Sequence, residues 1–447
     1  MVRGGRRRAV AGFAETRPMQ LIPSRHYWRA EGSKLWRQPL AWIALSALFA
    51  VLLASAVSAG LDARAWRSAA ALDAAARAAA IDSATAQVQT PPGPAAAIAA
   101  YELGRGDLGV TRMPVQAGLG LGVQRLSVLP TRLKASLDNR LVELRDPGPL
   151  RNPLLNDTGL PGVPAMVALL LPLVALVLCG GLLQEEREHG RLGLLRVQST
   201  HGMWPLVAAA LGWRCLCIWA VTAVATLPAL LLDPGSNAPV TLAWIGALAV
   251  FTSVWVVLGG CLSWAPVSGA SSMLAALGLW LALTFAVPAA LALAAERAAP
   301  MPSRLLSIVQ IRTAQQESEA HEQDLAKAWY AAHPGVQAPA TAVWPATFVA
   351  RALGQEAALG PLARSFDARR AEQAAFVNRW AWVSPGLALV LWGEFLAGTD
   401  AASQLRYRDQ VDAFEQRWRK FFMPAVMDRR GLSAEDLKKL PAFGPAD

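Results

Sequence analysis

Residues 164–183 read PAMVALLLPLVALVLCGGLL and contain no charged side chain. A helix needs about 20 apolar residues to cross the hydrocarbon core of a bilayer. Because hydrocarbon offers the backbone no hydrogen-bond partner, such a segment crosses as a helix that satisfies its own peptide groups. This stretch therefore predicts an integral membrane protein.

Four further uncharged stretches of comparable length occur at residues 39–60, 215–232, 240–262 and 273–295. Of the 447 residues, 54% are hydrophobic and 17% are charged, whereas soluble domains carry about 25% charged residues. The predicted fold class is an α-helical integral membrane protein with five membrane-spanning (transmembrane) helices.

A further apolar block, residues 381–397 (AWVSPGLALVLWGEFLA), allows two interpretations. Its length just suffices for a sixth span, but Glu394 would cost about 2.5–3.5 kcal/mol at a helix centre. Its tryptophans are typical of a helix that lies in the membrane interface. We favour a packed or interfacial helix and keep a sixth span as the alternative.

The basic N-terminal flank predicts the orientation. Residues 1–38 contain nine basic and two acidic residues, a net charge of +7. Short positive flanks stay in the cytoplasm, so we expect residues 1–38 and 184–214 inside and residues 61–163 and 297–447 outside. This topology accounts for most of the net charge of +10, and nucleic acid is not an expected partner.

The same flank leaves two questions open about the start of the chain. A basic region, an apolar run and the small residues 54–56 also resemble a signal peptide, although 38 residues before the run are many for a leader. Met19 is an alternative start to Met1.

The two long outside segments favour helix. Residues 61–88 are rich in alanine and should continue the first span outward until the prolines at 91–94. Helices are also expected at 304–332, 362–380, 401–424 and 433–440. Since the spans bring the ends of both segments together, we expect one mainly helical extracytoplasmic (periplasmic) domain built from the two.

Motifs for catalysis are missing from the sequence. None of the six lysines follows a glycine, so a Walker A loop cannot form. HExxH and G-x-S-x-G strings do not occur, and the five histidines are scattered. We expect a non-catalytic chain that has no cofactor or metal site of its own.

Residues 184–196 read QEEREHGRLGLLR, directly after the second span. One interpretation is a solvated loop whose charges stop transfer into the membrane. The other is a short amphipathic segment parallel to the membrane, which presents its charges to a cytoplasmic partner while its leucines stay at the bilayer.

The string from Glu186 to Leu195, EREHGRLGLL, resembles the E-R-E-x-G-T-L-x-L-L motif of type-2 ABC transporter permeases. It departs from that motif at Arg191, where the family has threonine. The resemblance implies a coupling helix that contacts a separate ATPase subunit. Its expected contact residues are Glu186, Arg187, Glu188, Gly190, Arg191, Leu194 and Leu195.

The resemblance covers most of the chain for one subgroup, which has a large extracytoplasmic insertion between its first two spans. The strings that carry it are Arg151-Asn152-Pro153-Leu154, Leu171-Pro172-Leu173, Leu211-Gly212-Trp213-Arg214, Ser384-Pro385-Gly386 and Ala397-Gly398-Thr399-Asp400.

Two points of this likeness stay open. Arg214 is expected at the cytoplasmic end of the third span, and the alternative is a span that begins at Trp204 and buries it. The subgroup ends with a final span, and nothing after Leu440 can cross. Either the chain is clipped, or residues 381–397 insert, or the C-terminus stays outside.

The resemblance implies the permease subunit of an ATP-driven ABC transporter in a bacterial inner membrane. A separate ATPase chain would carry ATP and Mg²⁺, and a second permease half would complete a homo- or heterodimer. The five stretches contain no ionisable residue, which argues against a small-ion path and favours a hydrophobic or amphipathic substrate, or mechanical work. The alternative function is a non-transporting envelope anchor or scaffold whose outside domain binds a periplasmic or other envelope protein.

Overall fold

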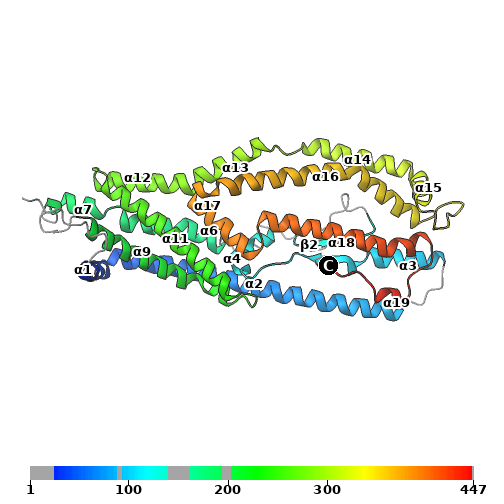
Figure 1. Ribbon diagram of the computed structural model, residues 1–447, viewed down its shortest axis with the longest axis horizontal. Helices are drawn as coiled ribbons and strands as arrows, with labels where there is room; N and C mark the ends of the chain where they lie inside the picture. The colour runs from blue at the N-terminus through cyan, green and yellow to red at the C-terminus, as the bar shows by residue number, and fades with distance from the viewer. Residues whose placement is uncertain (1–24, 88–92, 139–160, 194–202, 445–447) are drawn as a thin grey trace, which may run out of the picture.

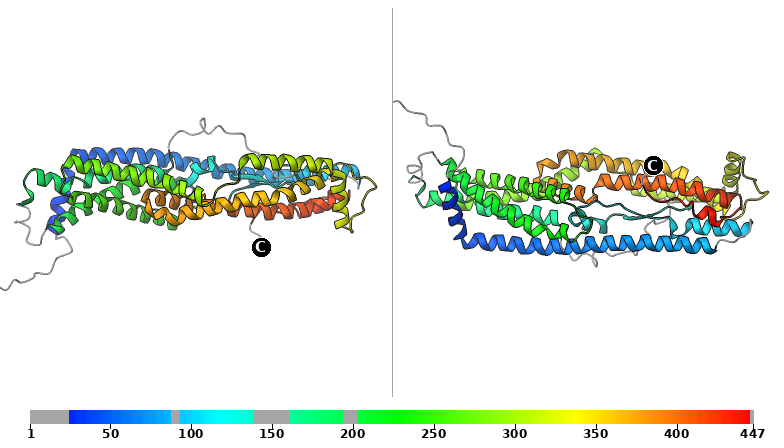
Figure 2. Two further views of the ribbon diagram at one scale, coloured as in Figure 1. Left: turned by 90° about the horizontal axis from the view of Figure 1, so that it is seen from above. Right: turned by 60° about the horizontal axis from the view of Figure 1, so that its bottom comes forward.

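The computed structural model describes residues 25–87, 93–138, 161–193 and 203–444. Over these ranges the molecule is elongated, and most helices run along its longest axis (Figure 1). The apolar helices lie at one end, called the membrane bundle below. The helices of the distal unit, defined below, lie at the other end, and α2 (Pro39–Gln87) extends through both (Figure 2).

Five helical runs among the described residues are long and apolar enough to cross a membrane, which confirms the predicted fold class. The first is the beginning of α2. The others are α6 (Val163–Cys179) with α7 (Leu182–Glu188), α9 (Trp204–Thr226) with α10 (Pro228–Leu231), α11 (Ala238–Trp264), and α12 (Gly269–Leu281) with α13 (Val287–Ala298). A π-helical turn, Ala282–Ala286, joins α12 to α13.

The third run differs from the stretch expected at 215–232, because its helix begins at Trp204. Pro205 lies in the first turn, where proline costs no hydrogen bond. Arg214 therefore lies inside the helix and is buried, at 3% exposure. The helix tolerates this charge because carbonyl oxygens and a carboxylate from neighbouring helices surround it, as described below.

The helix that contains the first span continues far beyond it, as predicted. It is unbroken from Pro39 to Gln87, the last residue described before position 93. Arg67, midway along it, forms an ion pair with the buried Asp233 in the turn between α10 and α11, and donates to the carbonyl oxygen of Gln116 over 2.7 Å. These bonds fix α2 to the bundle where it leaves the apolar region.

The distal unit consists of α3 (Pro94–Arg105), the helices α14 (Arg304–Ala320), α15 (Glu322–Ala332), α16 (Ala346–Trp380), α18 (Ala401–Met427) and α19 (Ala434–Leu437), and a two-stranded ribbon. In the ribbon, β1 (Val110–Arg112) pairs antiparallel with β2 (Arg132–Lys134), with Thr111 opposite Leu133. The sequence had left this ribbon unassigned.

The segment between the first two apolar helices and the segment after the fifth share one core, as predicted. Tyr101 of α3 is fully buried together with Phe414, Trp418 and Phe422 of α18. The indole nitrogen of Trp418 donates to the carbonyl oxygen of Gly104 over 2.8 Å. A Cβ at Gly104 would lie 2.7 Å from Leu137 and 3.0 Å from Phe422, so glycine lets α3 approach α18 closely.

The block at 381–397 forms a 3₁₀ turn (Ala381–Val383) and then α17 (Pro385–Ala397). With 13 residues, α17 is about 20 Å long, shorter than the hydrocarbon core of about 30 Å. It packs against α6 and the short α4 (Leu119–Gly122). Its Glu394, which is mostly buried, forms an ion pair with Arg125. The length and packing favour the packed helix over the sixth span.

Candidate functional site

The charged string after the second apolar helix folds as α7 and the turn behind it. α7 lies at the end of the bundle, near α1 (Arg25–Trp36) and the α11–α12 connection (Figure 1). It follows α6 after a break at residues 180–181. The described part of the string therefore forms a short helix at the tip of the bundle.

Glu186 is mostly enclosed, and two cations neutralise it. Lys34 Nζ of α1 lies 3.0 Å from Glu186 Oε1, and Arg191 Nε lies 3.4 Å from Oε2. The Glu186 side chain is 16% exposed. It therefore links α7 to α1 and to its own following turn, and it offers little surface to a partner.

Arg187 and Glu188 join α7 to the connection that leads into α12. Arg187 Nη1 donates to the carbonyl oxygen of Ala265 over 2.8 Å. Glu188 Oε1 accepts from the amide of Gly269 over 2.8 Å. Gly269 is the first residue of α12, where unpaired amides and the helix dipole favour a carboxylate. The pair of bonds attaches α7 to the fifth apolar helix.

Gly190 ends α7 in a left-handed conformation, with φ of 67°. Its amide donates to the carbonyl oxygen of Arg187 over 3.0 Å, and the amide of Arg191 donates to that of Glu186 over 2.9 Å. This pair of bonds is the Schellman arrangement, which satisfies the last carbonyls of a helix. Gly190 therefore makes a tight bend directly after α7.

The outward-facing part of the segment is residues 188–191, all of them exposed. Two of the predicted contact residues, Leu194 and Leu195, lie outside the described residues. Among the described ones, Glu186 and Arg187 mainly bind other parts of this chain, whereas Glu188 and Arg191 also face outward.

Gln184 is a residue of this site that the sequence did not single out. Its side chain is buried, and Nε2 donates to the carbonyl oxygen of Leu262 over 2.9 Å and to the hydroxyl of Ser272 over 3.2 Å. It lies four residues before Glu188, on the same face of α7, and both side chains contact the α11–α12 region. Its position in the charged string was the available signal.

A buried ion pair lies beneath the segment. Arg214 Nη1 of α9 is 3.7 Å from Glu31 Oε2 of α1. The guanidinium also donates to the carbonyl oxygens of Leu178 (2.9 Å) and Ala210 (3.0 Å). It therefore joins α1, α6 and α9, and the expectation that Arg214 lies at the end of its helix is wrong.

A cavity of about 420 Å³ opens between α1, α7 and α9. Its charged lining is Glu31, Lys34, Glu186 and Arg191, and its apolar lining includes Leu182 and Leu206. In the part of the chain that the structure describes, no cluster of three or more His, Cys, Asp or Glu side chains could hold a metal ion. These side chains can bind charged groups of either sign.

Comparison with known proteins gives one match. A family model described as a domain of unknown function, DUF3526, matches residues 304–446. No curated protein matches the chain. No solved structure matches it either. The matched region comprises α14 to α19, most of which belongs to the distal unit, and α7 lies outside it.

Proposed function

We propose that this chain is the membrane subunit of an ATP-driven transporter of the type-2 ABC class, and that a separate ATPase binds at residues 188–191. The observation that carries the proposal is the attachment of α7 on two sides. Glu186 connects it to α1, Arg187 connects it to the α11–α12 connection, and Glu188 connects it to the start of α12. A displacement of α7 by a partner would therefore move two helices of the bundle together.

The proposed mechanism needs two global states that contact the ATPase differently. When the ATPase pair closes on ATP, it would press on the exposed turn at 188–191. The bonds to α1 and α12 would pass this movement into α2 and α13, and α2 continues as one helix into the distal unit. This continuity favours mechanical work on an outside partner. A hydrophobic or amphipathic substrate is favoured by the absence of ionisable residues from the five apolar stretches.

A second membrane subunit is part of the proposal. In the run Gly269–Ala298, 6% of an apolar stretch of 18 residues is buried inside the protein. In the other four runs the buried share of such a stretch is 33–50%. A helix so poorly covered by its own chain has a free face for another subunit, so we place the second half there.

An alternative function, a scaffold for an envelope protein, is favoured by one surface of the distal unit. Leu305, Ile308 and Val309 lie on α14 at helical spacing and are 78%, 49% and 58% exposed. Exposed apolar side chains that gather in this way mark contact surfaces. A protein partner can bind this surface whether or not the chain also binds an ATPase.

The test is site-directed photocrosslinking in the native membrane. A benzophenone amino acid replaces His189 in one variant and Gln337, an exposed residue of the distal unit, in the control. We expect position 189 and not position 337 to crosslink to a P-loop ATPase, identified by mass spectrometry. If probes at 188, 189 and 191 capture no ATPase while the complex is intact, the proposal is wrong and the scaffold function stands.

A further inference from the structure

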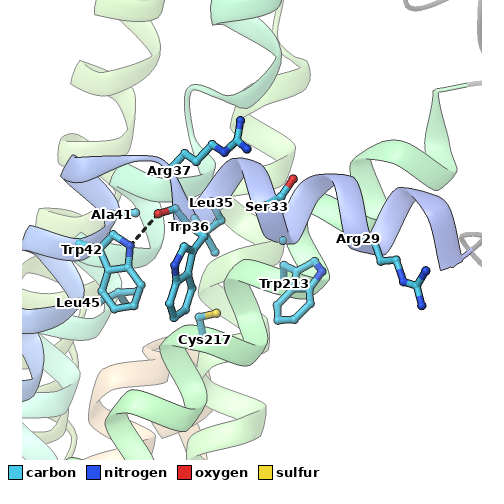
Figure 3. Close-up of a pocket in the computed structure, with 11 residues that line it drawn as sticks. Arg29, Ser33, Leu35, Trp36, Arg37, Ala41, Trp42, Leu45, Trp213 and Cys217 are labelled. Carbon is cyan, nitrogen blue, oxygen red and sulfur yellow. Dashed lines mark hydrogen bonds between the residues drawn. The ribbon is translucent and has the colours of Figure 1, made fainter.

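A second cavity, of about 570 Å³, lies between α1, the first turns of α2, and α9. Its walls include three tryptophans, Trp36, Trp42 and Trp213 (Figure 3). Leu45 and Cys217 lie further along α2 and α9, in the direction in which both helices enter the bundle. The groove thus becomes apolar toward the interior of the membrane.

The indole rings are fixed by bonds within the protein. Trp42 Nε1 donates to the carbonyl oxygen of Trp36 over 3.0 Å, and the two rings meet edge to face at 4.5 Å. Trp213 Nε1 donates to the carbonyl oxygen of Trp28 over 2.5 Å. Since both of these N–H groups are used, the rings offer the groove mainly their carbon surfaces. Trp36 lines the groove, yet the residue is 71% exposed.

The rim of the groove is basic. Arg29 and Arg37 line it, both are exposed, and among the described residues neither has an ion-pair partner and no carboxylate lines the groove. In Figure 3 the Arg37 side chain extends to the side of the helix opposite the ring of Trp36, whereas the Trp36 indole extends toward Cys217. The two arginines lie at different places along the rim, and the groove is apolar toward Leu45 and Cys217.

The position of α1 determines what such a groove can bind. This helix lies crosswise to α2 at the end of the bundle (Figure 2), and the apolar run of α2 begins at Pro39, directly after it. The groove is thus at the depth of the lipid headgroups, where tryptophan rings and arginines with apolar stems are favoured. A free anion would use the arginines and leave the indoles uncovered.

We propose that this groove binds an anionic phospholipid. Its phosphate lies near Arg37, and one acyl chain lies against Trp36, Trp42 and Leu45. Arg29, eight residues earlier in the chain, adds positive charge farther along the rim. The bound lipid covers the exposed indole and holds α1 in place against α9. The proposal does not depend on the ATPase.

The test uses the full chain in nanodiscs that contain a trace of phosphatidylglycerol with a diazirine in its acyl chain. After irradiation, labelled peptides are mapped by mass spectrometry. We expect labelling at residues 36–45 and 213–217. Unlabelled phosphatidylglycerol should compete at least about 10-fold better than phosphatidylcholine, and inorganic phosphate should not compete.

The charge of the rim is tested with the double variant Arg29→Gln/Arg37→Gln. Each basic residue at a membrane surface contributes about 1 kcal/mol to anionic lipid binding, so labelling should fall roughly 30-fold for the pair. Arg304→Gln/Arg312→Gln, two exposed positions on α14, is the matched control and should leave labelling unchanged. Trp36→Ala should weaken both lipids alike.

Equal labelling by both lipids in the wild-type protein would mean non-specific annular lipid only and would overturn the proposal. Labels that map away from the groove would overturn it as well. The competition between lipids uses the unaltered chain, so it decides the matter even if a variant fails to fold.

Discussion

The hydroxyl of Ser384 donates a hydrogen bond to the carbonyl oxygen of Leu283 over 2.7 Å, and this bond joins α17 to the π-helical turn of the fifth membrane run. The same hydroxyl accepts from the amide of Leu387 over 3.2 Å and so caps α17. Serine hydroxyls satisfy carbonyls that a helix irregularity frees in apolar surroundings. Since α16 ends at Trp380, this contact connects the distal unit to a membrane helix.

Replacing Ser384 with alanine removes both bonds. We expect a loss of about 1–2 kcal/mol and faster amide hydrogen exchange in residues 282–288 and 385–388. Ser253→Ala is the control, because the Ser253 hydroxyl donates to the carbonyl oxygen of Ala249 in its own helix. Unchanged exchange in both segments would show that Ser384 does not hold the π turn.

Removing Arg214 leaves the carboxylate of Glu31 buried without its cation. Breaking a buried pair in this way costs about 3–5 kcal/mol, whereas replacing both members with neutral groups of similar size is often tolerated. Arg214→Ala should therefore unfold at much lower temperature in mild detergent, and Glu31→Gln/Arg214→Met should regain most of the loss. Full stability of Arg214→Met alone would contradict this account. Arg379→Met, at an exposed position, is the control.

Substitution of Gly190 tests the turn that ends α7. A Cβ at this position would meet no atom within 4 Å, so the cost of Gly190→Ala comes from the backbone conformation alone, at about 1–2 kcal/mol. We expect faster exchange of the amides at 190 and 191 and a lower ATPase rate in the assembled complex. Gly190→Asn should behave almost like the wild type, because asparagine tolerates this conformation. Gly193→Ala, also in open space but without a positive φ, should have no effect.

The capping box at the start of α19 predicts a dependence on pH. The backbone amide and hydroxyl of Ser433 donate to Asp436 and hold the pKa of its carboxyl below the ordinary value. A lowered folded pKa adds stability above the unfolded pKa of about 3.9, and that stability is lost as the pH falls through the folded pKa. Thermal unfolding at pH 7 and pH 3 should show the loss in the wild type.

In Ser433→Ala the hydroxyl bond to Asp436 is lost while the backbone amide of residue 433 can still donate. The pKa of Asp436 should therefore return part of the way toward its ordinary value, and this part of the pH dependence should become smaller. At pH 7 the variant should be less stable by about 1 kcal/mol, the usual cost of a lost cap. An identical pH profile in both proteins would exclude a contribution from the Ser433 hydroxyl.

The membrane class and most helices could be predicted because their causes are local. An uncharged run of about 20 residues has to form a helix in hydrocarbon whatever surrounds it, and Ser433 with Asp436 marks a helix start over three residues. The glycine bend after α7 follows in the same way, since a positive φ depends on one residue. Contacts with neighbouring helices have little influence on these features.

The tertiary structure decided the features that depend on partners distant in the chain. Arg214 can lie inside its helix because α6 and α1 bring Leu178 and Glu31 to it. The sequence around Arg214 does not predict these two contacts. The same holds for the enclosure of Glu186 by Lys34 and for the groove beside Trp36. The sequence by itself determined which segments are apolar helices, because burial in lipid is a property of each segment. Which charges those helices enclose was decided by packing, because the free energy of a buried charge depends on groups contributed by other helices.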